Sequence, residues 1–141
     1  MSRQNVRQAF AQSLRSVAAL KTVFDAEPKI VQGQDMPAAY VAITRSEEKR
    51  IANQQRMITY TVEARVGAAY PTPKSEDAQT QFDAVLDAVV AQIRTDKTLG
   101  GKVLRSGERI RVEVAEPAVD QQTTALFAVV ETDVDELING A

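Results

Sequence analysis

The stretch Met57-Ile58-Thr59-Tyr60-Thr61-Val62-Glu63-Ala64-Arg65-Val66 carries the clearest secondary-structure signal in the chain. Its apolar and aromatic side chains at positions 60, 62, 64 and 66 alternate with polar side chains at 59, 61, 63 and 65. Because successive side chains of a strand point to opposite faces, this alternation predicts a strand with one buried and one solvated face. We therefore expect a fold built on a sheet.

A second strand is predicted upstream, over residues 38–44, which are apolar and rich in strand-favouring residues. Residues 45–56, with the sequence RSEEKRIANQQR, lie between the two strands and are too highly charged for a core. They predict a projecting hairpin arm.

Two amphipathic helices are predicted, one on each side of this strand pair in the sequence. Over residues 2–20, with Ser2 as a cap, apolar side chains recur every three or four positions: Val6, Phe10, Leu14 and Val17. Residues 67–75 contain two prolines and predict a loop. The second helix follows this loop, with Thr72 or Ser75 as its N-cap, and contains Phe82, Val85, Leu86, Val89, Val90 and Ile93.

The remaining strands are predicted at residues 29–31, 102–114 and 123–130. Residues 125–130 are apolar at every position, which predicts a central strand covered on both faces. Residues 133–141 are expected to form an acidic tail. The order of elements predicts a single α+β domain over residues 1–141, with a mainly antiparallel sheet packed by two helices on one face.

Composition excludes several classes of function. The 141 residues contain no cysteine and no histidine, so disulfides, thiolate zinc sites, cysteine nucleophiles and histidine general bases are absent. Seventeen Lys+Arg against nineteen Asp+Glu give a net charge of −2, which disfavours a generally basic nucleic-acid binder. No signal-peptide pattern or membrane-spanning apolar run occurs, so we expect a soluble, unexported protein without a membrane partner.

Three charged or glycine-rich groups are candidate sites. Asp35, Glu47 and Lys49 superficially resemble the carboxylate and lysine set of Mg²⁺-dependent nucleases, but a solvated charged hairpin explains them better. Gly100-Gly101 follows a helix, the wrong order for a phosphate-binding loop, and is expected to end that helix within residues 96–101. A solvated helix face explains the acids Glu76, Asp77, Asp83 and Asp87. We therefore predict no catalytic, metal-binding or cofactor-binding residue.

Charge is distributed unevenly along the chain. Residues 1–112 hold all seventeen basic residues and twelve acids, a net +5, whereas residues 113–141 hold seven acids and no base, a net −7. Two explanations of this uneven charge remain open. Residues 113–141 form a chance acidic edge or a solvating end, or their charge serves head-to-tail association of subunits into a ring. The candidate interface residues are Arg45, Glu47, Glu48, Lys49, Arg50 and Arg56 in the arm and Asp133, Asp135 and Glu136 in the tail.

The stretches MPAAYVAI at 36–43, TYTV at 59–62 and DKTLGGKV at 96–103 follow one another among the predicted helices and the charged arm. In these stretches and in the order of its elements, most of the chain resembles the tail terminator proteins of long-tailed (siphovirus-like or myovirus-like) bacteriophages. The resemblance implies a non-enzymatic structural protein of the virion tail and neck, assembled in the host cytoplasm and without a cofactor.

The resemblance also implies a set of partners. The subunits would form a hexameric ring that caps the tail tube, stops its polymerisation and offers a docking surface to the head–tail connector or stopper protein. DNA would pass through the lumen without sequence-specific binding. A stopper, head-completion or other minor tail protein of the neck is the alternative within this class.

Two alternatives come from other classes. A Mg²⁺-dependent nuclease would bring Asp35, Glu47 and Lys49 within reach of one ion. A small-molecule-binding α+β dimer would need an apolar pocket, of which 5% aromatic residues give little sign.

Overall fold

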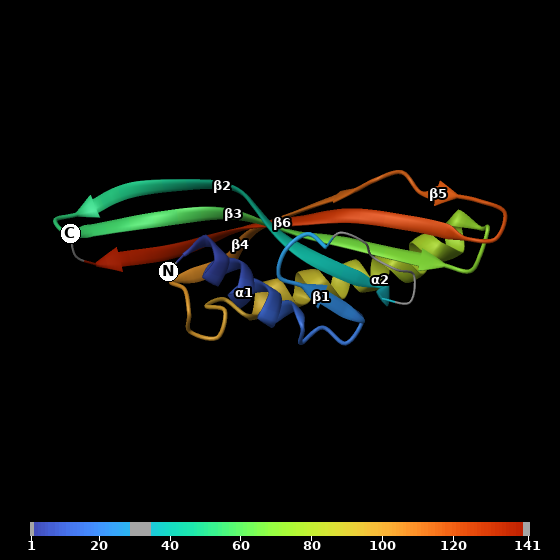
Figure 1. Cartoon of the computed structure of the whole chain (residues 1–141), viewed down its shortest axis with the longest axis horizontal. Coiled ribbons are helices and arrows are strands. Elements are labelled where there is room, and N and C mark those ends of the chain that lie inside the picture. Colours follow the sequence, from blue (N-terminus) through green and yellow to red (C-terminus); the bar gives the residue numbers. More distant parts are fainter. Residues whose placement is uncertain (1, 29–34, 140–141) are drawn as a thin grey trace.

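The computed structural model describes residues 2–28 and 35–139, and in this part of the chain one six-stranded sheet packs against two helices (Figure 1). The elements are, in chain order, α1 (Arg3–Leu14), β1 (Thr22–Phe24), β2 (Ala38–Ala52), β3 (Gln55–Tyr70), α2 (Ser75–Thr95), β4 (Arg105–Val114), β5 (Ala118–Val119) and β6 (Thr124–Asn139). The strand order is β1-β2-β3-β6-β4, with β5 paired to β6, and the β1–β2 pair is parallel while the others are antiparallel. The predicted α+β fold is confirmed.

Strands β3 and β6 form the centre of the molecule. The strand predicted over residues 57–66 lies within β3, and its side chains Tyr60, Val62, Ala64 and Val66 are buried as the alternation predicted. Strand β6 pairs with β3 from end to end and with β4 on its other side. Its predicted central position is therefore confirmed.

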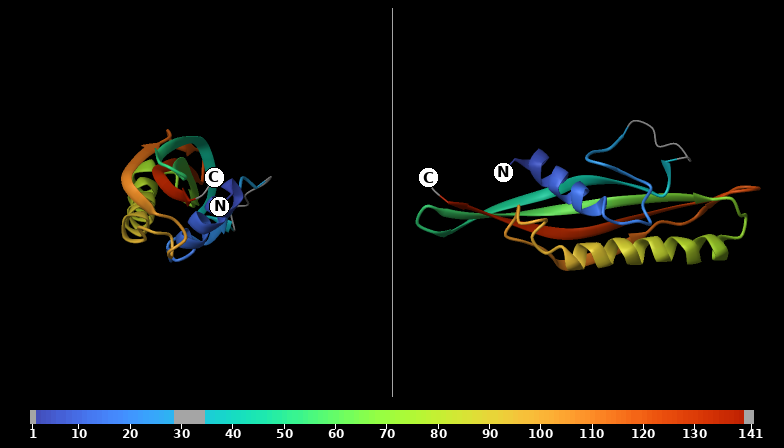
Figure 2. Two further views of the ribbon diagram at one scale, coloured as in Figure 1. Left: turned by 90° about the vertical axis from the view of Figure 1, so that its left-hand side faces the viewer. Right: turned by 90° about the horizontal axis from the view of Figure 1, so that it is seen from below.

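Only one face of β6 is covered. Leu126, Ala128 and Val130 are buried on the face against which both helices pack, which we call the covered face. Phe127 points to the opposite, open face and is 48% exposed. The expectation that residues 125–130 are covered on both faces is wrong, because α1 and α2 lie on the same side of the sheet (Figure 2).

Helix α1 is shorter than the sequence predicts. The Ser2 hydroxyl accepts a hydrogen bond from the Asn5 N–H at 3.2 Å and caps the helix, as expected. The helix ends at Leu14 rather than at residue 20. Beyond it, short-range bonds from Val17 N–H to the Leu14 carbonyl and from Leu20 N–H to the Val17 carbonyl form successive turns that still bury both apolar side chains.

The loop predicted over residues 67–75 is shorter in the structure. Strand β3 continues to Tyr70 and α2 begins at Ser75, so the loop comprises residues 71–74. The N-cap of α2 is Lys74, so the expectation of Thr72 or Ser75 as cap is wrong. The Thr72 hydroxyl instead accepts from Lys74 N–H at 3.1 Å, which shapes the loop just before the helix. Asp96 ends α2, as predicted.

The outer strands differ from the predictions. Strand β1 at residues 22–24 was not predicted, while the strand predicted at 29–31 lies outside the described residues. Strand β4 begins at Arg105 instead of 102, because residues 98–104 form turns after α2.

Candidate functional site

The charged residues 45–56 lie at the distal end of the β2–β3 hairpin. There β2, the turn at Asn53-Gln54 and the start of β3 extend beyond both helices (Figures 1 and 2). Strand β6 runs along the same extension. We use "arm" for residues 45–61 together with 133–139, and "tip" for residues 45–56.

The acidic segment predicted as a tail is the third strand of the arm. Residues 133–139 continue β6 and each pairs with a residue of β3, from Thr61 opposite Asp133 to Gln55 opposite Asn139. The expectation of an acidic tail from residue 133 is therefore wrong. The backbone hydrogen bonds that residues 133–139 form with β3 outweigh the poor strand propensity of aspartate and glutamate.

All nine candidate interface residues consequently lie in one region of one chain. Glu47 and Asp135 both pair with Thr59, and Glu48 and Glu136 both pair with Ile58, from opposite sides of β3. The basic arm and the acidic segment, expected to meet across two subunits, lie side by side within one subunit. The charge split along the sequence does not correspond to two ends of the molecule.

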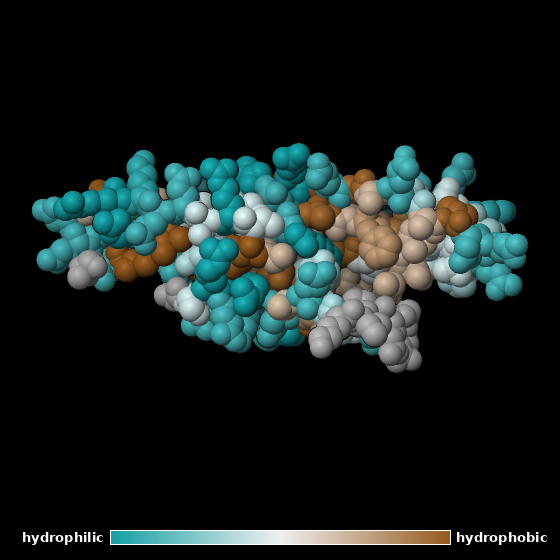
Figure 3. Space-filling model, turned by 45° about the horizontal axis from the view of Figure 1, so that its top comes forward, coloured by the Kyte–Doolittle hydropathy of each residue, from teal (hydrophilic) through white to brown (hydrophobic). Residues whose placement is uncertain are grey.

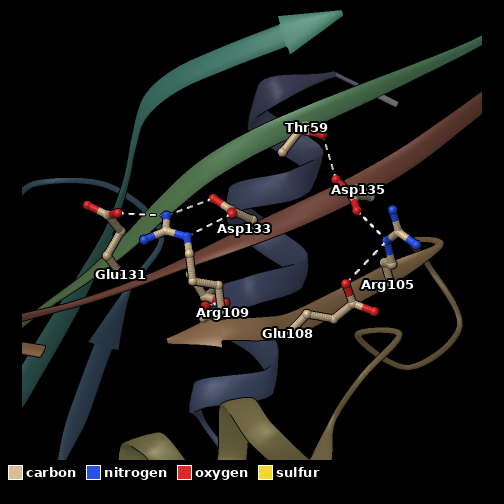
Figure 4. A network of polar contacts seen from close by, with 8 residues as sticks. Thr59, Arg105, Glu108, Arg109, Glu131, Asp133 and Asp135 are labelled. Atoms are coloured by element: carbon tan, nitrogen blue, oxygen red, sulfur yellow. Dashed lines mark hydrogen bonds and ion pairs between the residues drawn. The ribbon is translucent and has the colours of Figure 1, made fainter. Parts of the chain in front are cut away.

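Arginines of β4, which the sequence analysis did not single out, neutralise the acids of β6 (Figure 4). Arg109 bonds Glu131 at 2.8 Å and Asp133 at 3.0 Å. These hydrogen bonds, Asp133 first, raise the pKa of Arg109. The cross-strand pairing of β4 with β6 is a long-range contact, so no local pattern marked these arginines.

A second cluster lies nearer the tip. Asp135 is largely buried, receives a hydrogen bond from the Thr59 hydroxyl at 2.6 Å and pairs with Arg105. Glu108 lies 3.7 Å from the same guanidinium, and the hydrogen bond to Asp135 is the main cause that raises the pKa of Arg105 (Figure 4). One buried carboxylate thus ties β3, β6 and β4 together at the base of the arm.

The tip keeps basic charge that no acid of the described residues neutralises. Its four basic and two acidic residues give a net +2. Two exposed ion pairs form within it: Arg45 with Glu47 at 3.9 Å and Arg56 with Glu48 at 3.2 Å. Arg50 bonds only the neutral Asn53, at 3.0 Å, and Lys49 forms no ion pair within the part of the chain that the structure describes. Lys49 and Arg50 are the cations available to a partner.

The residues of the nuclease alternative do not meet. Asp35 precedes β2, whereas Glu47 and Lys49 lie in its distal half. The ten residues from Ala38 to Glu47 alone span about 30 Å of extended strand. Within residues 2–28 and 35–139, no cluster of three or more acidic side chains is arranged to hold a metal ion. The nuclease alternative is therefore wrong.

Gly100 and Gly101 form the turn after α2, as predicted. Their φ angles are +70° and +84°, and their N–H groups bond the side chains of Asp96 and Thr98 at 3.0 and 3.1 Å. The glycines serve the left-handed backbone of the turn.

The open face carries an apolar groove that the sequence analysis missed. The groove has a volume of about 480 Å³ and crosses β2, β3, β6 and the end of β4, with Tyr40, Gly67, Phe127 and Ala115 among its lining residues. The Phe127 ring lies over Gly67, where an added Cβ would come within 3.0 Å of the ring. Little sign of an apolar pocket was expected, and this expectation is wrong.

The groove also contains a cation that is already engaged. The Arg65 guanidinium lies 5.6 Å from the centre of the Tyr40 ring and 2.9 Å from the Glu63 carboxylate. Its hydrogen bonds to Tyr40 and Glu63 raise the pKa of Arg65. Figure 3 shows hydrophobic residues gathered on this half of the surface, whereas the arm is hydrophilic except for a hydrophobic strip along one side.

Neither helix in the described residues is long and apolar enough to cross a bilayer. The chain matches no protein-family model and no curated protein. Among solved structures it is similar to a chain of the virion of the native gene transfer agent particle, with 15% identity and a TM-score of 0.40 over 92% of this chain and 94% of that one. With so low a TM-score, the likeness assigns no function to this chain.

Proposed function

We propose that this protein is a structural component of a phage-like virion and acts as a tail terminator. Its subunits form a hexameric ring that caps the tail tube, stops polymerisation and presents a docking surface to the head–tail connector. The resemblance of residues 36–43, 59–62 and 96–103 to tail terminators supports the proposal. The structural observation that carries it is the arm, a three-stranded extension beyond the helical layer with unneutralised cations at its tip.

The arm suits contacts between subunits. A ring of identical subunits needs a heterologous contact, in which one surface of a subunit meets a different surface of its neighbour. Arg45, Glu47, Glu48, Lys49, Arg50 and Arg56 are exposed and supply the contact surface. Asp133 and Asp135 stiffen the arm through Arg109 and Arg105, and Glu136 lies buried beside them in β6.

The termination mechanism follows from a ring with two unlike faces. One face matches the last ring of the tail tube, while the other lacks the surface on which a further tube ring assembles. Tube growth stops there, and the exposed face is left for the connector. DNA passes through the lumen without sequence-specific contacts.

The first test is negative-stain microscopy with mass measurement of the purified protein, alone and mixed with tail tubes. Rings of about six copies, or density capping one tube end, are the expected result. A ring that ignores tubes but binds the portal-side adaptor would identify a stopper protein instead. A protein that neither forms rings nor binds either partner would overturn the proposal.

A charge reversal tests the arm. The double variant Lys49→Glu, Arg50→Glu reverses the two available cations and is expected to abolish ring formation or tube capping while the subunit stays folded. The matched control Lys97→Glu, Lys102→Glu reverses two exposed cations outside the arm and should assemble normally. Equal assembly of both variants in the tube-capping assay would exclude the arm as the contact.

A further inference from the structure

We propose that the open-face groove receives the arm tip of a second copy of this chain, with Ile51 as the apolar anchor. This contact would join opposite ends of two molecules. The inference rests on the proposed ring, for which it names the contact between neighbouring subunits.

The groove is an exposed apolar surface of the size of a binding site. Its volume of about 480 Å³ falls in the range of small-ligand pockets. Phe127, a large aromatic side chain, is 48% exposed at its centre, and Ala115 is exposed beside it. Met36 and Tyr40 extend the apolar lining on the β2 side. Contiguous apolar surface of this kind is typical of an interaction site.

The tip offers a matching apolar side chain. Ile51 is 45% exposed at the end of β2, next to Arg50 and the hairpin turn. It cannot reach the groove of its own chain, because eleven residues of the same strand separate it from Tyr40, a distance of about 35 Å. Only a neighbouring copy can bring the two surfaces together.

The charges around the two surfaces are complementary. Lys49 and Arg50 flank Ile51 and have no acidic partner in the described residues. Glu113 lines the groove and, among the described residues, pairs only with the exposed Arg111, at 3.2 Å, and Glu116 follows the groove-lining Ala115. No basic residue occurs anywhere in 113–141. The groove's own cation, Arg65, is held by Glu63.

A further acid lies just after β5, outside the lining of the groove. Asp120 follows β5, at the end of the molecule opposite the tip (Figure 1). Its carboxylate accepts the N–H groups of Gln122 and Thr123 at 2.9 and 2.7 Å, and these hydrogen bonds lower its pKa. Asp120 thus adds to the acidic charge of Glu113 and Glu116, which is complementary to the basic tip of the next copy and steers association.

The contact is heterologous, so every pair of subunits retains one free tip and one free groove. Further subunits add until the last tip meets the first groove. If the rotation between neighbouring subunits closes, this single contact gives a ring without a second kind of interface.

The absence of cysteine allows a direct test by disulfide crosslinking. Ile51→Cys places a thiol at the tip, and Ala115→Cys places one in the groove. When the two single variants are mixed and oxidised, the 51–115 heterodimer should be the main product, because a disulfide requires the two Cα atoms within about 7 Å. The double variant should give a ladder of crosslinked species that ends at the ring.

A matched control uses Leu104→Cys, a site as exposed as Ile51, at 46%, and outside both surfaces. Crosslinking of Ile51→Cys to Leu104→Cys should stay at the background level. If the 51–115 product does not exceed this background, the inference is overturned.

Complementation provides a second test that does not rely on disulfides. Ile51→Asp destroys the tip and Phe127→Asp destroys the groove, and thermal unfolding checks that each variant is folded. Each alone should remain monomeric, whereas a mixture retains one intact tip and one intact groove and should form dimers but nothing larger. Rings formed by either variant alone would overturn the inference.

The outcomes separate this inference from the proposed function. If wild-type rings cap tail tubes but rings of the Ile51→Cys, Ala115→Cys double variant do not crosslink between residues 51 and 115, the groove contact fails while the terminator role stands. If 51 and 115 crosslink in solution but no tube is capped, the contact stands and the terminator role fails.

Discussion

The two ends of the β3–β6 strand pair are stabilised by different physics. Both strands are 16 residues long and pair throughout. Over the half toward Tyr70 and Thr124, apolar side chains are buried against α1 and α2. The core reaches the base of the arm with Tyr60 and Val134, and nearer the tip the helices end, so that ion pairs and a hydroxyl–carboxylate bond hold the strands together. One continuous ladder is therefore part of the core at one end and exposed at the other.

The largest expected difference is between an aromatic side chain on the covered face and one on the open face. Phe82→Ala removes a side chain that is 1% exposed in the core under α2 and should cost about 3–5 kcal/mol of unfolding free energy. Phe127→Ala, on the open face, should cost about 1 kcal/mol, in keeping with its partial exposure. Urea denaturation of both variants measures the two values.

Equal losses for the two variants would show that the open face is covered in solution. A small loss for Phe82→Ala would instead contradict the placement of α2 on the sheet. Either result would remove the distinction between the covered and open faces.

The fold was predictable wherever local periodicity carries the information. The alternation at residues 60–66 and the helical spacing from Phe82 to Ile93 each depend on a single element, and both predictions are confirmed. The run 125–130 was misread because apolar residues at every position do not say what covers each face. Whether a strand face is covered depends on the tertiary arrangement. The exposed Phe127 shows that one face of β6 is not covered.

The arm was only partly predictable for the same reason. A charged segment between two adjacent strands indicates a hairpin, since its ends are brought together locally. The third strand at 133–139 was missed because acidic residues disfavour strands, and its partner Arg105 lies 30 positions away in sequence. The groove combines residues from five strands and two loops, so no single stretch of sequence marks it.

The second prediction tests whether polar contacts hold the arm. Asp135→Ala leaves the half-buried Thr59 hydroxyl without its acceptor and removes the link to Arg105, so we expect a loss of about 1–3 kcal/mol. Hydrogen exchange should accelerate at residues 55–61 and 133–139 while amides of the covered half remain protected.

A matched control is Glu113→Ala, which breaks the exposed pair with Arg111 and should change stability by no more than about 0.5 kcal/mol. If Asp135→Ala accelerates exchange equally along the whole of β6, the two ends of the strand pair are one cooperative unit and the comparison fails.

The smallest effect concerns two tyrosines of β3, Tyr60 at the base of the arm and Tyr70 at the last position of the strand. Burial raises the pKa of Tyr70, in the covered half, above its ordinary value of 10.0. At the base of the arm, burial and the nearby Glu136 raise the pKa of Tyr60. A group whose pKa is higher in the folded state stabilises the protein fully below the unfolded value and loses that contribution as pH rises through the folded value.

The stability of the wild type should therefore be insensitive to tyrosine ionisation below pH 10.0 and fall above it. Tyr60→Phe and Tyr70→Phe should each reduce the alkaline fall, as followed by urea denaturation at increasing pH. Because the charge of Glu136 contributes at Tyr60 alone, Glu136→Gln should lower the tyrosinate titration midpoint of Tyr60 and leave that of Tyr70 unchanged. A shift of both midpoints by Glu136→Gln would mean that the arm and the covered half are electrostatically coupled along the strand, against the division of the sheet into two independently stabilised ends.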